Sequence, residues 1–175
     1  MINVRKENEE VLYPEDDLVL VSAQDLDELK RLASLNPRKR IRLCAHRSPD
    51  DRLHEMVIVH MRECYVRPHK HLDKAESMLI LEGEVDVVLF DDDGSLRQIV
   101  QMGAPGTGKV FYQRLSSSVY HCLLIRTEFL VFKEVIEGPF IRDNTVFPAW
   151  APVEDAPAEF RARIDALIQS KEGLP

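Results

Sequence analysis

The residues most suited to chemistry in this chain are two histidines and a glutamate in residues 68–76, namely His69, His71 and Glu76. In an extended strand, side chains at positions i and i+2 share a face, so His69 and His71 can point the same way. A turn after His71 would let Glu76 begin the next strand and face the same pocket. Imidazole and carboxylate groups together bind divalent transition metals such as Zn, Fe, Mn, Ni or Co. The spacing therefore predicts one divalent metal site on a β-scaffold.

The size and charge of the chain limit the classes of partner. With 175 residues, it is expected to form one domain with short extensions. Its formal net charge is -7 and its pI is about 5.4. An acidic protein of this kind is disfavoured as a binder of nucleic acid or of an anionic membrane surface. We therefore expect a small-molecule substrate.

The location of the protein is predicted from what the sequence lacks. The N-terminal residues show no basic patch followed by an apolar core, and no apolar run approaches the roughly 20 residues of a membrane span. The three cysteines, Cys44, Cys64 and Cys122, are too few and too scattered for a disulfide framework. We therefore expect a cytoplasmic protein.

The N-terminal part, residues 1–37, is expected to hold a loose lead-in over residues 1–17 and one helix over residues 23–35. Ser22 and Asp25 form an N-cap pair, and Leu26, Leu29 and Leu32 follow at helical spacing. The proline at position 37 ends the helix, because the residue before a proline avoids the helical conformation.

Residues 38–140 have the pattern of an antiparallel β-barrel. From position 40, short segments with a period of two are separated by turn residues, most of them about 8–12 residues apart. Residues 141–175 are expected to pack on this barrel through an aromatic-proline segment, 147–152, and a short C-terminal helix. We therefore predict a mostly β fold, an antiparallel jelly roll flanked by two helices.

A glycine-rich segment, residues 103–110, nearly matches the phosphate-binding loop of nucleotide-binding proteins. Val110 stands where that loop needs a hydroxyl group, and the β-branched and aromatic residues that follow favour a strand over a helix. We interpret this segment as a loop between strands.

Segment 110–115 supplies candidate catalytic residues, because Tyr112 and Arg114 alternate there with Phe111, Gln113 and Leu115. One of these two sets must face inward. If Tyr112 and Arg114 face inward, they line the interior and hold a polar or anionic ligand near the metal, and we assign them as catalytic residues on that basis. In the opposite orientation, both are solvated.

The basic run at residues 37–42 has two interpretations. It is a solvated junction between helix and strand, or a small anionic site with Arg40 and Arg42 on one face of a strand.

The spacing His69-x-His71-x4-Glu76-x6-Gly83 resembles the first motif of the cupins, which are small antiparallel jelly rolls. The second cupin motif carries a third histidine on a later strand, and His121 is the candidate. A satisfied core histidine is the alternative for His121. The chain departs from the cupin pattern at Glu63, Ser116, Ser118 and Ile125, where the motifs usually have glycine, glycine, proline and asparagine.

A wider resemblance is to the WbuC-type cupin-fold metalloproteins. The segments that carry it are residues 37–42, His46-x-Ser48-Pro49-x-Asp51, Arg67-Pro68-His69-x-His71, Glu76-Ser77, Gly83-Glu84-Val85, Phe90-Asp91-Asp92-x-Gly94 and Glu137-Gly138-Pro139-Phe140. The resemblance implies a cupin metal site formed by His69, His71, Glu76 and His121. It also implies a sugar-related substrate, because the family is associated with bacterial surface-polysaccharide gene clusters. By analogy with cupins, we expect a homodimer.

Three functions agree with these features. The first is a metal-dependent enzyme acting on a carbohydrate-type or nucleotide-sugar substrate. The second is a non-catalytic cupin that binds a metabolite and regulates a partner. The third is a metal-free sugar isomerase or epimerase in which His69 or His121 moves a proton.

Overall fold

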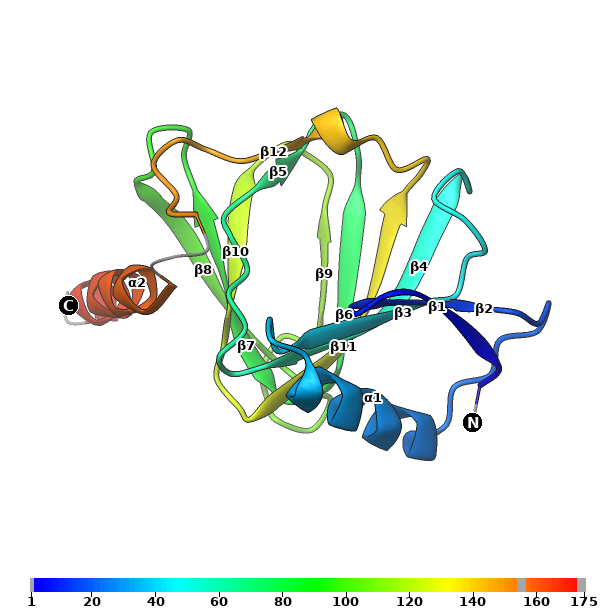
Figure 1. Cartoon of the computed structure of the whole chain (residues 1–175). Helices are drawn as coiled ribbons and strands as arrows, with labels where there is room; N and C mark the ends of the chain where they lie inside the picture. The colour runs from blue at the N-terminus through cyan, green and yellow to red at the C-terminus, as the bar shows by residue number, and fades with distance from the viewer. Residues whose placement is uncertain (1, 154–156, 173–175) are drawn as a thin grey trace.

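The computed structural model describes residues 2–153 and 157–172 as a mostly β protein with one helix near each end (Figure 1). The parts of the expected N-terminal lead-in and C-terminal extension at residues 1, 154–156 and 173–175 lie outside the described residues. The helices are α1 (Ala23–Leu35) and α2 (Pro157–Glu172), with a 3-10 turn, η1 (Arg142–Asn144). The strands are, in order, β1 (Val4–Asn8), β2 (Val11–Pro14), β3 (Arg40–Cys44), β4 (Leu53–Met61), β5 (Lys70–His71), β6 (Glu76–Glu82), β7 (Glu84–Phe90), β8 (Leu96–Gly103), β9 (Tyr112–Leu115), β10 (Tyr120–Ile125), β11 (Phe129–Glu137) and β12 (Thr145–Val146).

Two sheets face each other across the interior (Figure 1). The larger has the strand order β1-β2-β3-β4-β11-β6-β9, and the smaller has the order β10-β7-β8. A short pair, β5 and β12, lies at one end between them. The β2–β3 pair is parallel, and the β4–β11, β6–β11 and β7–β10 pairs are antiparallel.

Each sheet has an apolar residue set on both of its faces. Alternate residues of the two sheets fill the space between them, among them Ile58, Val87 and Phe132. The residues on the outer face of the larger sheet, such as Ile41 and Leu43, pack with Leu29 and Ala33 of α1. The outer face of the smaller sheet packs with α2 through Val88, Phe90, Cys122, Phe160 and Ile164. Helix α1 therefore covers part of the outer face of the larger sheet, and α2 covers part of the outer face of the smaller one.

Helix α1 begins and ends where the sequence predicts. Ser22 is its N-cap and forms a capping box with Asp25: the N–H of Asp25 donates to the Ser22 hydroxyl, and the N–H of Ser22 donates to the Asp25 carboxylate. The chain leaves the helix at Asn36, directly before Pro37. Neither described helix combines the length and the apolar composition that a membrane crossing requires.

The expectation of a loose lead-in over residues 1–17 is wrong. Strands β1 and β2 form an antiparallel hairpin, and β2 adds to the larger sheet beside β3. The backbone N–H of Arg42 donates to the carbonyl of Glu10 at 2.8 Å. Leu12 and Tyr13 are buried, so the hairpin is held by apolar burial as well as by sheet hydrogen bonds.

Candidate metal centre

His69 and His121 are brought together by backbone pairing. Their residues form an antiparallel bridge in which the N–H of His69 donates to the carbonyl of His121 at 3.0 Å, and the N–H of His121 donates back at 2.9 Å. Residues directly opposite each other in an antiparallel pair present their side chains on the same face. His71 lies two residues beyond His69 in extended backbone, so it shares that face.

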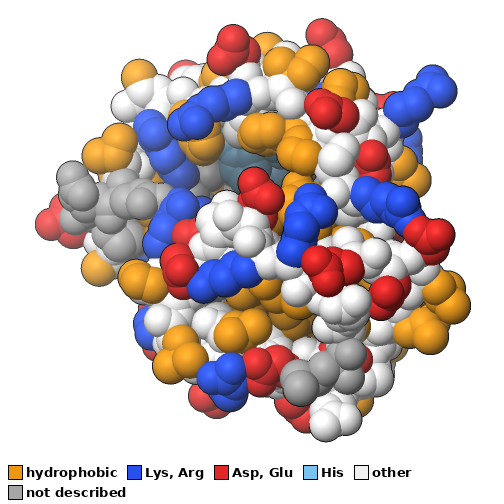
Figure 2. Space-filling view, turned by 45° about the vertical axis from the view of Figure 1, so that its right-hand side comes forward, with side chains coloured by type: hydrophobic (Ala, Val, Ile, Leu, Met, Phe, Trp, Pro, Cys, Tyr) orange, Lys and Arg blue, Asp and Glu red, His pale blue; other side chains and the backbone are white. Residues whose placement is uncertain are grey.

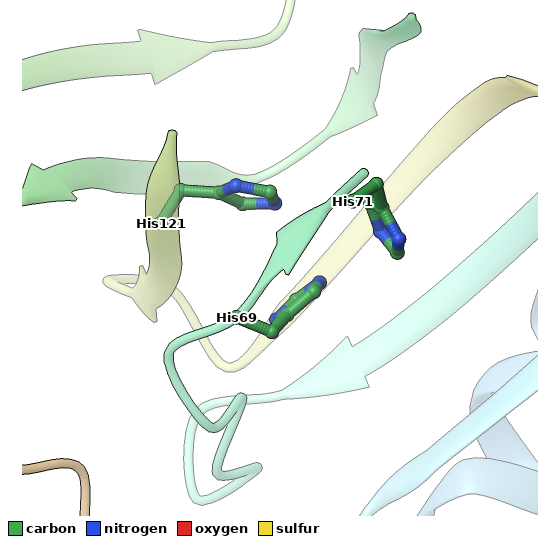
Figure 3. A group of neighbouring side chains, drawn as sticks. All are labelled: His69, His71 and His121. Carbon is green, nitrogen blue, oxygen red and sulfur yellow. The ribbon is translucent and has the colours of Figure 1, made fainter. Parts of the chain in front are cut away.

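The three imidazole rings converge on one space (Figure 3). One ligand atom of each of His69, His71 and His121 lies within 4.8 Å of those of the other two. The ring centroids of His69 and His121 are 4.6 Å apart, and those of His69 and His71 are 5.0 Å apart. This spacing suits three nitrogen ligands on one cation.

Hydrogen bonds at the far side of each ring fix which nitrogen faces that space. The Nδ1–H of His69 donates to the carbonyl of Arg67 at 2.8 Å, and that of His121 donates to the carbonyl of Val119 at 3.0 Å. The Nδ1 of His71 lies 3.2 Å from the hydroxyl of Thr145 on β12. Because a carbonyl only accepts, Nε2 carries the lone pair in His69 and His121, which is the arrangement found around bound metals.

Glu76, the first residue of β6, lies beside two of these rings. Its Oε1 lies 3.1 Å from Nε2 of His121, and its Oε2 lies 3.6 Å from Nε2 of His71. The structure therefore brings together His69, His71, Glu76 and His121, the residues that the cupin resemblance implies as ligands.

Burial keeps the imidazoles in the state that binds a metal. It is the largest cause that lowers the pKa of His69 and of His71 to about 3, and it also lowers the pKa of His121. All three rings are therefore neutral near pH 7. Burial raises the pKa of Glu76. A cation in this space would offset that cost and release the proton, so metal binding is expected to strengthen as the pH rises.

The four side chains border a cavity of about 630 Å³ that opens to solvent. Figure 2 shows a hollow with histidine surface at its floor and with lysine and arginine side chains among those around its mouth. The volume is within the range that holds small-molecule ligands in proteins. Besides the proposed ligands, polar residues on the cavity wall include Arg40, Arg42, His60, Arg67, Gln113 and Glu134.

Strand β9 adopts the orientation that leaves Tyr112 and Arg114 outside the cavity. Tyr112 is 50 % exposed, and the Arg114 side chain is exposed and donates to Ser116 at 3.2 Å. Gln113 lines the cavity instead, because it lies opposite Met78 on the inner face of β6. The catalytic assignment of Tyr112 and Arg114 depended on an inward orientation, and the structure shows the outward one.

Glu134 on β11 is a cavity residue that was not among the predicted site residues. It shares the inner face of its strand with Phe132 and lies diagonally from Glu76 across the β6–β11 pair. Burial, and then the negative charge of Glu76, raise the pKa of Glu134 to about 7, while the charge of Arg42 lowers it. A second carboxyl group with this pKa can take or give a proton at neutral pH. The sequence signal for Glu134 is a charged residue at an inward position of an apolar strand.

The raised pKa of Glu134 predicts a pH-dependent stability. The folded state holds this proton more tightly than the unfolded chain, whose glutamate has its ordinary pKa of 4.5. The stabilisation is therefore complete below about pH 4.5 and is lost as the pH rises to about 7. Glu134→Gln, which cannot ionise, should raise the free energy of unfolding at pH 8 by on the order of 2 kcal/mol, with little change at pH 4.

Urea denaturation of metal-free protein across this pH range measures the effect. The exposed Glu128 provides the control, and Glu128→Gln should follow the wild-type pH profile. An equal gain for Glu134→Gln at pH 4 and pH 8 would show that its effect is packing rather than ionisation.

The comparisons with known proteins agree with a cupin-like fold. A family of unknown function, DUF6016, matches residues 21–102, a stretch that contains His69, His71 and Glu76. No curated protein matches the sequence. Protein SO0799 from Shewanella oneidensis has a similar structure, with a TM-score of 0.53 and 10% identity over 73% of this chain and 83% of that one. With the facing sheets, this likeness confirms the predicted mostly β, cupin-like fold with two helices.

Two weaker structural likenesses cover only about a quarter of the other chain. The first is an oxalate decarboxylase of Bacillus subtilis with Mn(II) centres, with a TM-score of 0.44 and 16% identity over 55% of this chain and 24% of that one. The second is the capsular polysaccharide assembling protein CapF of Staphylococcus aureus, with a TM-score of 0.46 and 16% identity over 57% of this chain and 27% of that one.

Proposed function

We propose that this protein is a WbuC-type cupin that binds one divalent transition metal and acts as a metal-dependent enzyme. Its substrate is a small carbohydrate-type or nucleotide-sugar molecule used in surface-polysaccharide biosynthesis. The resemblance of segments 37–42, 46–51, 67–77 and 137–140 to that family supports the substrate class.

One observation carries the proposal, the convergence of His69, His71 and His121 with Glu76 at the edge of an open cavity. The donor set fits a divalent transition metal, because it combines neutral imidazoles with one carboxylate. A purely structural metal site is usually closed by its protein ligands, whereas this one borders space for a substrate.

The remaining cavity residues have separate roles in this proposal. A bound metal supplies Lewis acidity, which polarises a substrate oxygen or lowers the pKa of water. Gln113 offers an amide that can orient a hydroxyl group. Glu134 holds or accepts a proton inside the cavity near neutral pH. The apolar parts of the wall, including Ile58 and Phe132, offer surface for the carbon skeleton of a substrate.

Metal content is the direct test. We expect the purified protein to hold about one equivalent of a divalent transition metal by elemental analysis. Adding a metal to the stripped protein should stabilise it, by about 2.7 kcal/mol at a free concentration 100-fold above Kd. A protein that neither retains nor takes up Zn, Fe, Mn, Ni or Co would contradict the proposal. Sugar isomerisation that survives complete chelation would instead favour the metal-free isomerase.

A further inference from the structure

The wall of the cavity beside the metal centre carries positive charge on the inward face of a strand. Arg40 and Arg42 lie on the inner face of β3, and both line the cavity. His60 lies directly opposite Arg40 on β4 and also lines it. The other face of β3 is covered by α1. The strand therefore has a helix on one face and the cavity on the other.

The two arginines differ in their partners. The Nε of Arg40 donates to Glu10 at 2.7 Å, so Arg40 has an anionic partner, which it shares with Arg38. Within the described part of the chain, the side chain of Arg42 makes no hydrogen bond or ion pair, although it is half-buried. Glu134 faces the same cavity, and the charge of Arg42 lowers its pKa, but no ion pair at contact distance joins the two side chains. A guanidinium withdrawn from water in this way lacks the directly bonded anion that normally accompanies it.

His60 provides a second, independent sign of a missing ligand. Its side chain is 91 % buried, being 9 % exposed, and its Nδ1 has no hydrogen-bond partner among the described residues. Buried polar atoms in native proteins nearly always have a partner, and those that lack one often mark a ligand or water site. His60 lies next to Arg42 along the inner face of β3 and β4, because Arg40 is its cross-strand neighbour.

The position of Arg42 relative to the metal centre sets the size of the ligand. Glu76 is on β6 and Arg42 is on β3, with β11 and β4 between them. Neighbouring strands are about 4.8 Å apart, so the two backbones are separated by about 14 Å. Both side chains extend into the cavity, so one molecule of sugar size can reach both groups, whereas a free inorganic anion cannot.

We infer that Arg42 and His60 form an anion subsite, which binds the carboxylate or phosphate of an acidic sugar whose other end lies at the metal centre. The planar guanidinium can donate two parallel hydrogen bonds to either group. The inference rests on the proposed function in treating this cavity as the substrate site, and it narrows the substrate to an acidic one.

Calorimetric titration with three probes tests the inference. D-glucuronate presents a carboxylate, glucose 1-phosphate presents a phosphate, and D-glucose is neutral. We expect at least one acid to bind about tenfold or more tightly than glucose, and Arg42→Gln to remove this advantage. Arg42→Lys keeps the charge without the planar fork and should retain part of it. Comparing the two acids shows which anionic group the subsite takes.

Arg31→Gln is the matched control, because it makes the same change of charge on the exposed surface of α1. It should bind the acids as the wild type does. The inference is overturned if neither acid binds, if glucose binds as tightly as both acids, or if Arg42→Gln and Arg31→Gln behave alike. Thermal melts of each variant show whether it is folded.

Metal titration of the wild type, beside the acid titrations, separates this inference from the proposed function. If metal binding fails in the wild type but an acid still binds in an Arg42-dependent manner, the proposed function falls and the subsite stands. If metal binds but Arg42 has no effect on the acids, the subsite falls and the metal centre stands.

Discussion

Replacing His121 by alanine should lower the affinity for a divalent transition metal by more than about 100-fold, beyond the loss typical of residues that only support a ligand. The imidazole of His121 is the one that approaches Glu76 most closely, at 3.1 Å, and its Nδ1–H is already used by Val119. Removing it deletes one nitrogen donor and leaves Glu76 without its nearest imidazole. Competition titration of zinc or manganese against a coloured chelator measures the affinity.

His54→Ala is the appropriate control for this experiment. His54 is also a buried histidine of the larger sheet, but its ring stacks on His46 at 4.1 Å and bonds to the carbonyl of Pro49. Its loss should affect stability and leave the metal affinity unchanged. If His121→Ala binds metal as tightly as the wild type, His121 is a satisfied core histidine, and the centre has at most His69, His71 and Glu76.

The part of the candidate site that could be predicted from sequence is the part fixed by local geometry. The face shared by His69 and His71 follows from extended backbone alone, and Glu76 follows after one turn. His121 lies far along the chain, and its place opposite His69 depends on the pairing of distant segments. Only the resemblance to cupins made it a candidate.

The orientation of β9 could not be predicted, because its two residue sets are equally mixed. One set consists of Tyr112 and Arg114, whose long side chains each have a polar end. The other set contains polar Gln113 and apolar Leu115. The pairing with β6 sets the orientation of β9, because it places Gln113 opposite Met78, whose side chain is buried. Register is a property of two strands, and one short segment does not contain it.

Glu134 was not predicted, and Arg42 was left with two interpretations, for a different reason. Alternation of polar and apolar residues normally means that the polar face meets water. In β3 the apolar face meets α1, and the polar face meets the cavity rather than open solvent. The same pattern therefore describes an exposed strand and a strand that lines a ligand cavity.

The hairpin of β1 and β2 was not predicted, because strands of five and four residues give too short a pattern.

Gly83→Ala should lower the free energy of unfolding by at least about 3 kcal/mol. Gly83 joins β6 of the larger sheet to β7 of the smaller one, and its φ of +86° is in the left-handed region. A Cβ at this position would overlap the backbone carbonyl oxygen of Phe129 and lie 2.6 Å from the hydroxyl of Thr127. That hydroxyl accepts from the N–H of Glu84 at 2.9 Å, so the corner cannot open without losing a hydrogen bond of β7. Urea denaturation measures the loss.

Gly106→Ala separates backbone strain from overlap. Gly106 also has a left-handed φ, +97°, but nothing lies within 4 Å of an added Cβ. Its substitution should cost only about 1 kcal/mol, the ordinary penalty for a side chain in this conformation. The difference between the two variants measures the overlap at the corner. Equal losses would mean that the chain between β10 and β11 moves aside freely. Because β6 carries Glu76 and β7 pairs with the strand of His121, a rigid corner here holds the two halves of the metal centre at a fixed separation.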